Sequence, residues 1–191
     1  MPQLLTAADL AGQFRGFRRA FRVEARDAYW LGYEEAEFAL FLAGQPRPPE
    51  QVGWWRDYLT RLDGWRHDGR EVCRVLLDWE GDSPYKRWRR WCEQFHTRHR
   101  CGDDACPVKT GEDMLHMPGS LAEDLGLPLY DFWLFEDEDD VRLILMLFDQ
   151  QGKPTQHVLL HYNEVPDLVD KHLVWRDLAI AHATAAASAA A

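Results

Sequence analysis

Hydrophobic and polar positions alternate in several stretches of the chain, and these stretches predict β-strands. Apolar residues fall on alternate positions over residues 20–31 and 71–79, and residues 114–117 form a shorter stretch of the same kind. Residues 130–161 consist of apolar and aromatic runs separated by turn-forming clusters, which is typical of antiparallel hairpins. We therefore expect a mixed or antiparallel sheet of about five strands.

Apolar residues at helical spacing predict helices between and around these strands. Thr6 is a suitable cap for a short first helix, and Pro84 and Pro166 suit the first turn of two later helices. Two further helices are expected over residues 33–43 and 49–65. Helices and strands are thus mixed along the whole chain.

The predicted elements form a single α+β domain, in which helices pack mainly on one face of the sheet. A chain of 191 residues, of which 46% are hydrophobic, is long enough for one domain with a full core. We assign residues 1–183 to this domain and residues 184–191 to an alanine-rich tail. The nine tryptophans predict a strongly aromatic core, and some of them are expected to line a pocket.

Net charge and targeting signals limit the classes of function. The formal net charge of −10 opposes binding to nucleic acid by bulk electrostatics. No apolar stretch reaches the roughly 18 residues of a membrane-spanning helix, and the N-terminus lacks the pattern of a secretory signal. We therefore expect a cytoplasmic protein without a membrane segment, whose four cysteines stay reduced.

Residues 92–106 contain an unusual density of residue types that bind metals. Zinc prefers thiolate and imidazole ligands, and Cys92 and His96 would lie one turn apart on a helix. The spacing lacks the paired cysteines of zinc ribbons, so we favour a buried thiol beside solvated histidines and expect no cofactor. Zinc binding is one alternative, and a disulfide between Cys101 and Cys106 is another. The candidate zinc ligands are Cys92, His96, His99, Cys101 and Cys106.

The helix that is expected to start at Pro84 carries basic residues interleaved with Trp88, Trp91 and Phe95. Arginine beside aromatic side chains can hold phosphate or stack on bases, which would suit contact with a nucleotide or transfer RNA. We favour the alternative that the arginines meet water, a protein partner or the acidic run at residues 136–140. The basic residues are Lys86, Arg87, Arg89, Arg90, Arg98 and Arg100.

Several carboxylates and histidines are candidates for acid–base catalysis, if the fold brings them within hydrogen-bond reach. The set considered is Tyr85, Arg87, Glu112, His116, Asp131 and Asp149. Within it, Glu112, His116 and Asp131 are the candidate catalytic residues. No nucleophile elbow, phosphate-binding glycine loop or His-Glu-x-x-His zinc helix occurs in the sequence, so we favour structural roles for these side chains.

Five short motifs follow one another within about residues 14–183, and they are RVEARDAY, SPYKRW, GEDMLHMP, LYDFWLFED and WRDLAIAHA. In this order they resemble an actinobacterial domain family of unknown function, and YDFWLFED is the most specific element. Members of that family are often encoded beside helix-turn-helix regulators of the WhiJ type, which implies an accessory or regulatory role with such a regulator as partner. The sequence departs from the family pattern between Trp91 and Thr110. The matching positions are Tyr85, Arg87, Glu112, Asp131, Phe132 and Trp133.

Three functional hypotheses follow from these observations. We favour an accessory or regulatory protein that binds a protein partner or a small ligand through an aromatic, charged pocket. The alternative is a small enzyme of specialised metabolism with a Glu, Asp and His pocket, and a cleft shared by Tyr85, Arg87, Glu112 and Trp133 would favour it. A further alternative is the handling of nucleotides or transfer RNA through the arginine-rich helix. The candidate ligand-binding residues are Tyr85, Arg87, Glu112, Asp131 and Trp133.

Overall fold

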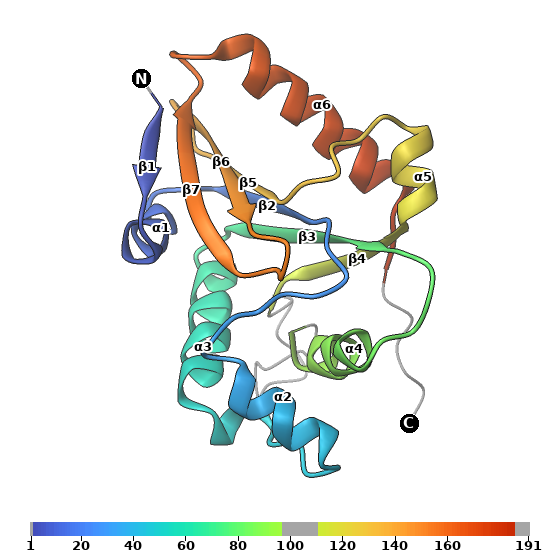
Figure 1. Cartoon of the computed structure of the whole chain (residues 1–191). Coiled ribbons are helices and arrows are strands. Elements are labelled where there is room, and N and C mark those ends of the chain that lie inside the picture. The colour runs from blue at the N-terminus through green and yellow to red at the C-terminus, as the bar shows by residue number, and fades with distance from the viewer. Residues whose placement is uncertain (1, 97–110, 186–191) are drawn as a thin grey trace.

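The computed structural model describes residues 2–96 and 111–185, which form one mixed sheet with helices around it (Figure 1). The strands, in chain order, are β1 (Gln3–Leu5), β2 (Arg19–Glu24), β3 (Glu71–Asp78), β4 (Asp113–Pro118), β5 (Phe132–Glu136), β6 (Val141–Phe148), β7 (Pro154–His161) and β8 (Thr184–Ala185). The helices are α1 (Ala7–Gln13), α2 (Glu35–Leu42), the 3-10 helix η1 (Pro49–Gln51), α3 (Gly53–His67), α4 (Pro84–His96), α5 (Gly119–Asp124) and α6 (Pro166–His182). None of these helices combines the length and the apolarity that crossing a membrane requires.

The sheet has a parallel half and an antiparallel half, and its strand order is β1-β7-β6-β5-β2-β3-β4-β8. Strands β2, β3 and β4 run parallel, so the chain crosses over through α2 and α3 after β2 and through α4 after β3. Strands β5, β6 and β7 extend the sheet from the other side of β2 as antiparallel neighbours, which confirms the hairpins predicted over residues 130–161.

Successive residues of the central strands point to opposite faces of the sheet and build two separate cores. On one face, which we call the pocket face, Ala20 and Trp133 pack with side chains of α1, α3 and α4. On the other face, the dry face, Phe21 and Leu134 pack with side chains of α5 and α6. In Figure 1 the two groups of helices lie on opposite sides of the sheet.

The prediction that helices cover mainly one face is therefore wrong. Strand β5 is buried on both faces from Phe132 to Phe135, and a strand that is apolar on both faces needs cover on both. The FWLF run in the sequence carries this signal, because a strand with one wet face would alternate between apolar and polar residues.

The sheet is also larger than the predicted five strands. Strands β1 and β8 contain only three and two residues, which is too short for an alternating pattern to show in the sequence. Thr184 and Ala185, which the sequence pattern assigned to the tail, pair with β4 as strand β8. The first predicted strand shortens to β2, and residues 25–34 leave the sheet as a loop.

Candidate functional site

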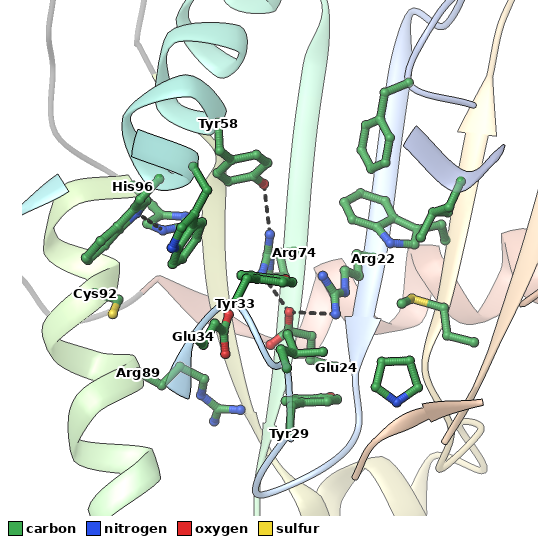
Figure 2. A pocket seen from close by; sticks show the side chains of 18 of the residues that line it. Arg22, Glu24, Tyr29, Tyr33, Glu34, Tyr58, Arg74, Arg89, Cys92 and His96 are labelled. Carbon is green, nitrogen blue, oxygen red and sulfur yellow. Dashed lines mark hydrogen bonds and ion pairs between the residues drawn. The ribbon is translucent and has the colours of Figure 1, made fainter. Parts of the chain in front are cut away.

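A cavity of about 920 Å³ lies on the pocket face of the sheet, under the loop of residues 25–34 (Figure 2). Eleven of its thirty lining residues are aromatic, so flat, weakly polar surfaces form a large part of its wall. Helix α4 contributes one face, since its lining residues from Tyr85 to His96 follow helical spacing. A cavity of this size and lining suits a small organic molecule.

A row of paired charges crosses the floor of the cavity. Arg22 and Glu24 of β2 and Arg74 of β3 point to the pocket face, because they alternate with the dry-face residues of their strands. Glu24 Oε1 accepts hydrogen bonds from Arg74 Nη1 at 2.6 Å and pairs with Arg22 Nη2 at 3.1 Å (Figure 2). Arg74 Nη2 also lies 3.0 Å from Glu112 Oε1, just before β4. Two cations and two anions thus balance in a buried row.

Glu112 also holds His96 and Tyr58 at the end of this row. His96 Nδ1 lies 2.6 Å from Glu112 Oε1, and the indole Nε1 of Trp55 donates to His96 Nε2 at 3.1 Å. Because the indole can only donate, His96 Nε2 is the acceptor and Nδ1 carries the proton. Burial opposes the charged form of Glu112, but Arg74 and His96 outweigh it and lower the pKa of Glu112 to about 2.

The loop of residues 25–34 is attached to the rest of the structure at its start and near its middle. Asp131 Oδ1 accepts a hydrogen bond from the Ala25 backbone at 3.0 Å, and the Trp30 backbone donates to the carbonyl of Gly152 at 2.9 Å. Gly152 has a φ of 81°, and a Cβ atom there would lie 2.7 Å from the carbonyl oxygen of Ala28. Only glycine therefore lets the β6–β7 turn approach the loop so closely.

Glu34 closes one side of the cavity at the end of this loop. Tyr85 donates its hydroxyl to Glu34 Oε2 at 3.2 Å. Burial and the nearby charge of Glu24 raise the pKa of Glu34 to about 7. This carboxyl can therefore exchange a proton near neutral pH.

His116 lies in a separate charged cluster at the carboxyl ends of β3 and β4. Its Nδ1 lies 2.7 Å from Asp78 Oδ2 and its Nε2 lies 2.9 Å from Glu93 Oε2. Burial alone would lower its pKa, but the hydrogen bonds to both carboxylates raise the pKa of His116 to about 9. His116 is therefore a charged bridge between two acids, and neither nitrogen is free for proton transfer to a ligand.

The structure brings together part of the ligand-binding set that the sequence suggested. Tyr85 and Trp133 line the cavity, Asp131 is buried behind Arg22, and Glu112 lies behind Arg74. Arg87 is outside, since it is half exposed and pairs with Asp82 at 2.7 Å. The proposed cleft shared by Tyr85, Arg87, Glu112 and Trp133 is therefore not formed as a unit.

Sequence reasoning missed the residues that form the floor and one wall of the cavity. They are Arg22, Glu24, Arg74, Glu34 and His157. A signal was present in the strands, because Arg22 and Glu24 share a face with the buried Ala20, and Arg74 shares one with the buried Val72. Charged residues on a face that is otherwise apolar indicate a polar cavity or a buried ion pair.

The candidate zinc ligands are only partly within the described residues. Cys92 lines the cavity and His96 has both ring nitrogens engaged, by Glu112 and Trp55. Burial raises the pKa of the Cys92 thiol well above its ordinary value, which opposes the thiolate that zinc would bind. His99, Cys101 and Cys106 lie outside the described residues, as does the candidate disulfide. Among residues 2–96 and 111–185, no group of three or more His, Cys, Asp or Glu side chains is arranged so that it could hold a metal ion.

The basic residues of α4 have acid partners close by. Lys86 is buried and lies 2.8 Å from Asp27, and Arg87 and Arg90 both pair with Asp82. One expectation was that these basic residues meet the acidic run at residues 136–140. That run pairs instead with Arg18, Arg19, Arg142 and Arg176. The handling of nucleotides or transfer RNA would require that Arg87, Arg90 and Arg98 share one exposed face free of acid partners. Arg87 and Arg90 do not meet this condition, and Arg98 and Arg100 lie outside the described residues.

Fold and site together describe an α+β protein with a large aromatic cavity over a buried row of balanced charges. The chain matches the family described as Domain of unknown function (DUF6879) over residues 8–188, and it belongs to that family. The match covers almost the whole sheet and every residue that lines the cavity. A search of curated proteins finds no match.

Proposed function

We propose that the protein is an accessory or regulatory protein that binds a small organic ligand in the cavity on its pocket face. The observation that supports this proposal most strongly is the cavity itself, with its volume of about 920 Å³ and its eleven aromatic lining residues. Stacking on such rings favours planar ligands, and the balanced charges of the floor supply orientation. The cavity contains two of the ligand-binding residues predicted from the sequence, Tyr85 and Trp133.

The states of two of the three predicted catalytic residues, Glu112 and His116, support binding rather than catalysis. Glu112, with a pKa of about 2, stays ionised, and His116, with a pKa of about 9, stays charged between two carboxylates. Neither group is suited to exchange protons near neutral pH. Both are better described as parts of a rigid charged framework around the cavity.

A small enzyme is the second candidate function, and two carboxyls favour it. Burial raises the pKa of Asp131 to about 6 and that of Glu34 to about 7, which are values suited to acid–base catalysis. Under this alternative Glu34, which faces the cavity, would exchange the proton and Tyr85 would orient it. Catalysis would then be abolished by Glu34→Gln, whereas ligand binding alone would persist.

The biological setting of the proposal rests on the resemblance of the motifs to an actinobacterial family. On that basis the protein would act beside a helix-turn-helix regulator encoded next to it, in the cytoplasm, which is the location expected from the sequence. Co-purification of the two proteins, measured by size-exclusion chromatography with and without an added ligand, tests this partner. Separate elution under both conditions would remove the regulator from the proposal and leave the ligand.

Isothermal titration calorimetry with indole, an uncharged planar probe, tests ligand binding in the cavity. The variant Met146→Trp adds a ring inside the cavity, which Met146 lines. The matched control is Leu147→Trp, which adds the same ring at the next position of β6, where the side chain is exposed. We expect the intact protein and the control to bind indole and the filled variant to lose binding.

Circular dichroism of each variant shows whether the fold is retained. Equal binding of indole by all three folded proteins would mean that the probe binds elsewhere and would contradict the proposal. The added ring itself is expected to cost about 1–3 kcal/mol of stability if it is overpacked, which most domains tolerate.

A further inference from the structure

One carboxyl in the wall of the cavity lacks the cationic partner that the other acids have. Among the described residues, the acids that line the cavity are Glu24, Glu34 and Glu93. Glu24 pairs with two arginines of the charged row, and Glu93 lies 2.9 Å from the charged His116. Glu34 pairs with no arginine, lysine or histidine among residues 2–96 and 111–185, and its single hydrogen bond comes from Tyr85. The charge of Glu34 is therefore not balanced by a side chain of this part of the chain.

One oxygen of Glu34 is open to the cavity. Oε2 accepts the hydroxyl of Tyr85 at 3.2 Å, whereas Oε1 accepts no hydrogen bond from residues 2–96 and 111–185. The side chain is only partly buried, and Oε1 is not sealed from solvent. A group that enters the cavity can therefore contact this oxygen directly.

Aromatic rings of the loop and of α4 lie around this carboxyl. The ring of Tyr85 lies 6.4 Å from that of Tyr29 and 5.4 Å from that of Trp88, measured between centroids. Tyr33 precedes Glu34 in the loop, and Figure 2 shows the two side chains beside each other. All four rings line the cavity. The face of an aromatic ring attracts a cation, so these rings and the carboxylate favour the same kind of ligand group.

The other charges near Glu34 already have partners. The row on the floor balances two cations against two anions, and within it Glu24 has the largest effect on the pKa of Glu34. Arg89 of α4 also lines the cavity, but its Nη2 lies 3.3 Å from Asp78. The charged and titratable groups of the cavity near Glu34 are Tyr29 and Tyr33 of the loop, Arg22 and Glu24 of β2, Arg74 of β3, and Tyr85, Arg89 and Cys92 of α4.

Two further arginines, Arg15 and Arg61, line the cavity where it opens to solvent. Both are exposed, so they keep their hydration and gain little from an added anion. Glu34 has lost part of its hydration and has no cation in return, so an added cation gains more there. The distribution of charge in the cavity thus favours a cationic group at Glu34.

We propose that Glu34, with the rings of Tyr33 and Tyr85, forms a subsite for a protonated amine that is carried on the flat body of a ligand. An N–H group of the amine donates to Glu34 Oε1, and its charge lies against the ring faces. The flat body stacks on the remaining aromatic wall. This inference rests on the proposed function, because it names the ligand class of the same cavity.

Isothermal titration calorimetry with indole and three indole derivatives tests the subsite. Tryptamine carries a protonated amine, tryptophol carries a neutral hydroxyl on the same two-carbon arm, and indole-3-acetate is an anion. We expect tryptamine to bind about tenfold more tightly than tryptophol or indole-3-acetate, because only it gives Glu34 a charge-assisted hydrogen bond. Benzylamine and benzyl alcohol repeat the comparison with a shorter arm and a smaller ring, so the result does not depend on the fit of one arm.

The variant Glu34→Gln removes the charge with little change of shape. We expect tryptamine and tryptophol to bind it equally well, while the affinity for indole stays that of the intact protein. Retained binding of indole also shows that the cavity is still formed. The matched control is Glu35→Gln, at the next position, where the side chain is exposed and lies outside the cavity. This control should keep the full preference for tryptamine.

The pH dependence of binding gives a second test of the same contact. Burial and the charge of Glu24 raise the pKa of Glu34 to about 7, so the ionised fraction grows between pH 6 and pH 8. An aliphatic amine stays protonated over this range. We therefore expect the affinity for tryptamine to rise about tenfold from pH 6 to pH 8, with no such rise for tryptophol or in Glu34→Gln. A rise that persists in Glu34→Gln would assign the effect to another group, such as His157, and would contradict the subsite.

The outcomes separate this inference from the proposed function. If neither indole nor any of the other compounds binds the intact protein, the cavity is not a ligand site, and both proposals fail. If indole binds but each amine binds no better than its alcohol, the cavity binds ligands and the amine subsite does not exist. Tightest binding of indole-3-acetate would place the charged contact at Arg15 and Arg61 and would also overturn the subsite.

Discussion

The two faces of the central sheet are built from the same strands but have opposite chemistry. Along β3, Val75 and Leu77 enter the apolar core under α5 and α6, whereas Arg74 points to the pocket face and joins the charged row. Along β2, Phe21 and Val23 belong to the dry face, and Arg22 and Glu24 to the pocket face. The strand alternation therefore separates a packing surface from a binding surface within a single sheet.

The difference shows what each face requires. The dry face needs only apolar side chains of fitting size, because close packing and the hydrophobic effect stabilise it. The pocket face carries buried charges, which are tolerated only when each has a partner. Substitutions on the two faces should therefore have different effects. Those on the dry face should change stability alone, whereas those on the pocket face should also change ligand binding.

Breaking the charged row should have the largest effect on stability. Arg74→Met removes the cation between Glu24 and Glu112 and leaves two buried carboxylates without it. We expect a loss of about 4 kcal/mol in the free energy of unfolding, measured by urea denaturation. The control Arg56→Met removes an exposed arginine that lies 3.7 Å from Asp57, and it should change stability by less than about 0.5 kcal/mol. Similar losses in the free energy of unfolding for the two variants would show that burial does not make the row of charges costly to break.

A substitution that creates a cavity in the core of the dry face should have the next largest effect on stability, and it should leave ligand binding intact. Leu134 is completely buried in that core, so Leu134→Ala should lower the free energy of unfolding by about 3 kcal/mol. Leu147→Ala, at an exposed position of β6, should cost less than about 0.5 kcal/mol. Indole affinity, measured well below the denaturation midpoint, should equal that of the intact protein. A loss of affinity in folded Leu134→Ala would mean that the two faces are not independent.

Acid should weaken the pocket face selectively. The pKa of Glu112 falls from an ordinary value of 4.5 to about 2 in the folded state, so its stabilising effect is complete above about pH 4.5. As the pH falls toward 2, the folded protein gains this proton less readily than the unfolded chain, and the contribution is lost. We expect Glu112 to account for roughly 2–3 kcal/mol of the acid destabilisation.

Urea denaturation between pH 5 and about pH 2.5 measures this contribution. Glu112→Gln should flatten the pH dependence over that range, whatever its stability at neutral pH. Glu71→Gln, exposed at the start of β3, is the control for loss of a carboxylate. An unchanged slope in Glu112→Gln would show that another group carries the acid dependence.

The smallest expected effect concerns the loop that covers the pocket face. Gly152 and Gly69 both have left-handed φ angles, of 81° and 76°, but only at Gly152 would a Cβ meet a backbone atom, the oxygen of Ala28. Gly152→Ala should therefore cost about 1–2 kcal/mol more than Gly69→Ala, since the shared φ strain cancels in the comparison. Thermal unfolding measures the difference. Equal losses would show that the loop yields to the added methyl group.

Much of the element pattern was predictable because it depends on local periodicity. The cap at Thr6, the prolines that begin α4 and α6, and the three hairpin strands all appear where the sequence places them. The second layer of helices was not predicted. Its signal, the FWLF run of β5, indicates burial on both faces, but periodicity alone does not say which helix covers each face.

The candidate site was predictable only in part. Tyr85 and Trp133 were named as ligand-binding residues and line the cavity, whereas Arg87 was named with them and lies outside. The helical spacing of α4 decides this, because Tyr85 and Arg87 are two positions apart and so face different directions. The floor residues Arg22 and Arg74 were not named as candidate site residues, although each shares a strand face with a buried apolar residue, Ala20 and Val72.

The sequence by itself determined where most helices and the longer strands lie, that the fold is α+β, and that the core is rich in aromatic residues. These properties follow from propensities and periods over a few neighbouring residues. Only the tertiary structure decided that β2 lies between β3 and β5, and this order places Arg22 beside Asp131, 109 positions away in the chain. Strand order depends on which strand and helix surfaces pack together with the lowest free energy, and these surfaces come from segments far apart in the chain. The cavity and the buried row of charges on its floor are consequences of it.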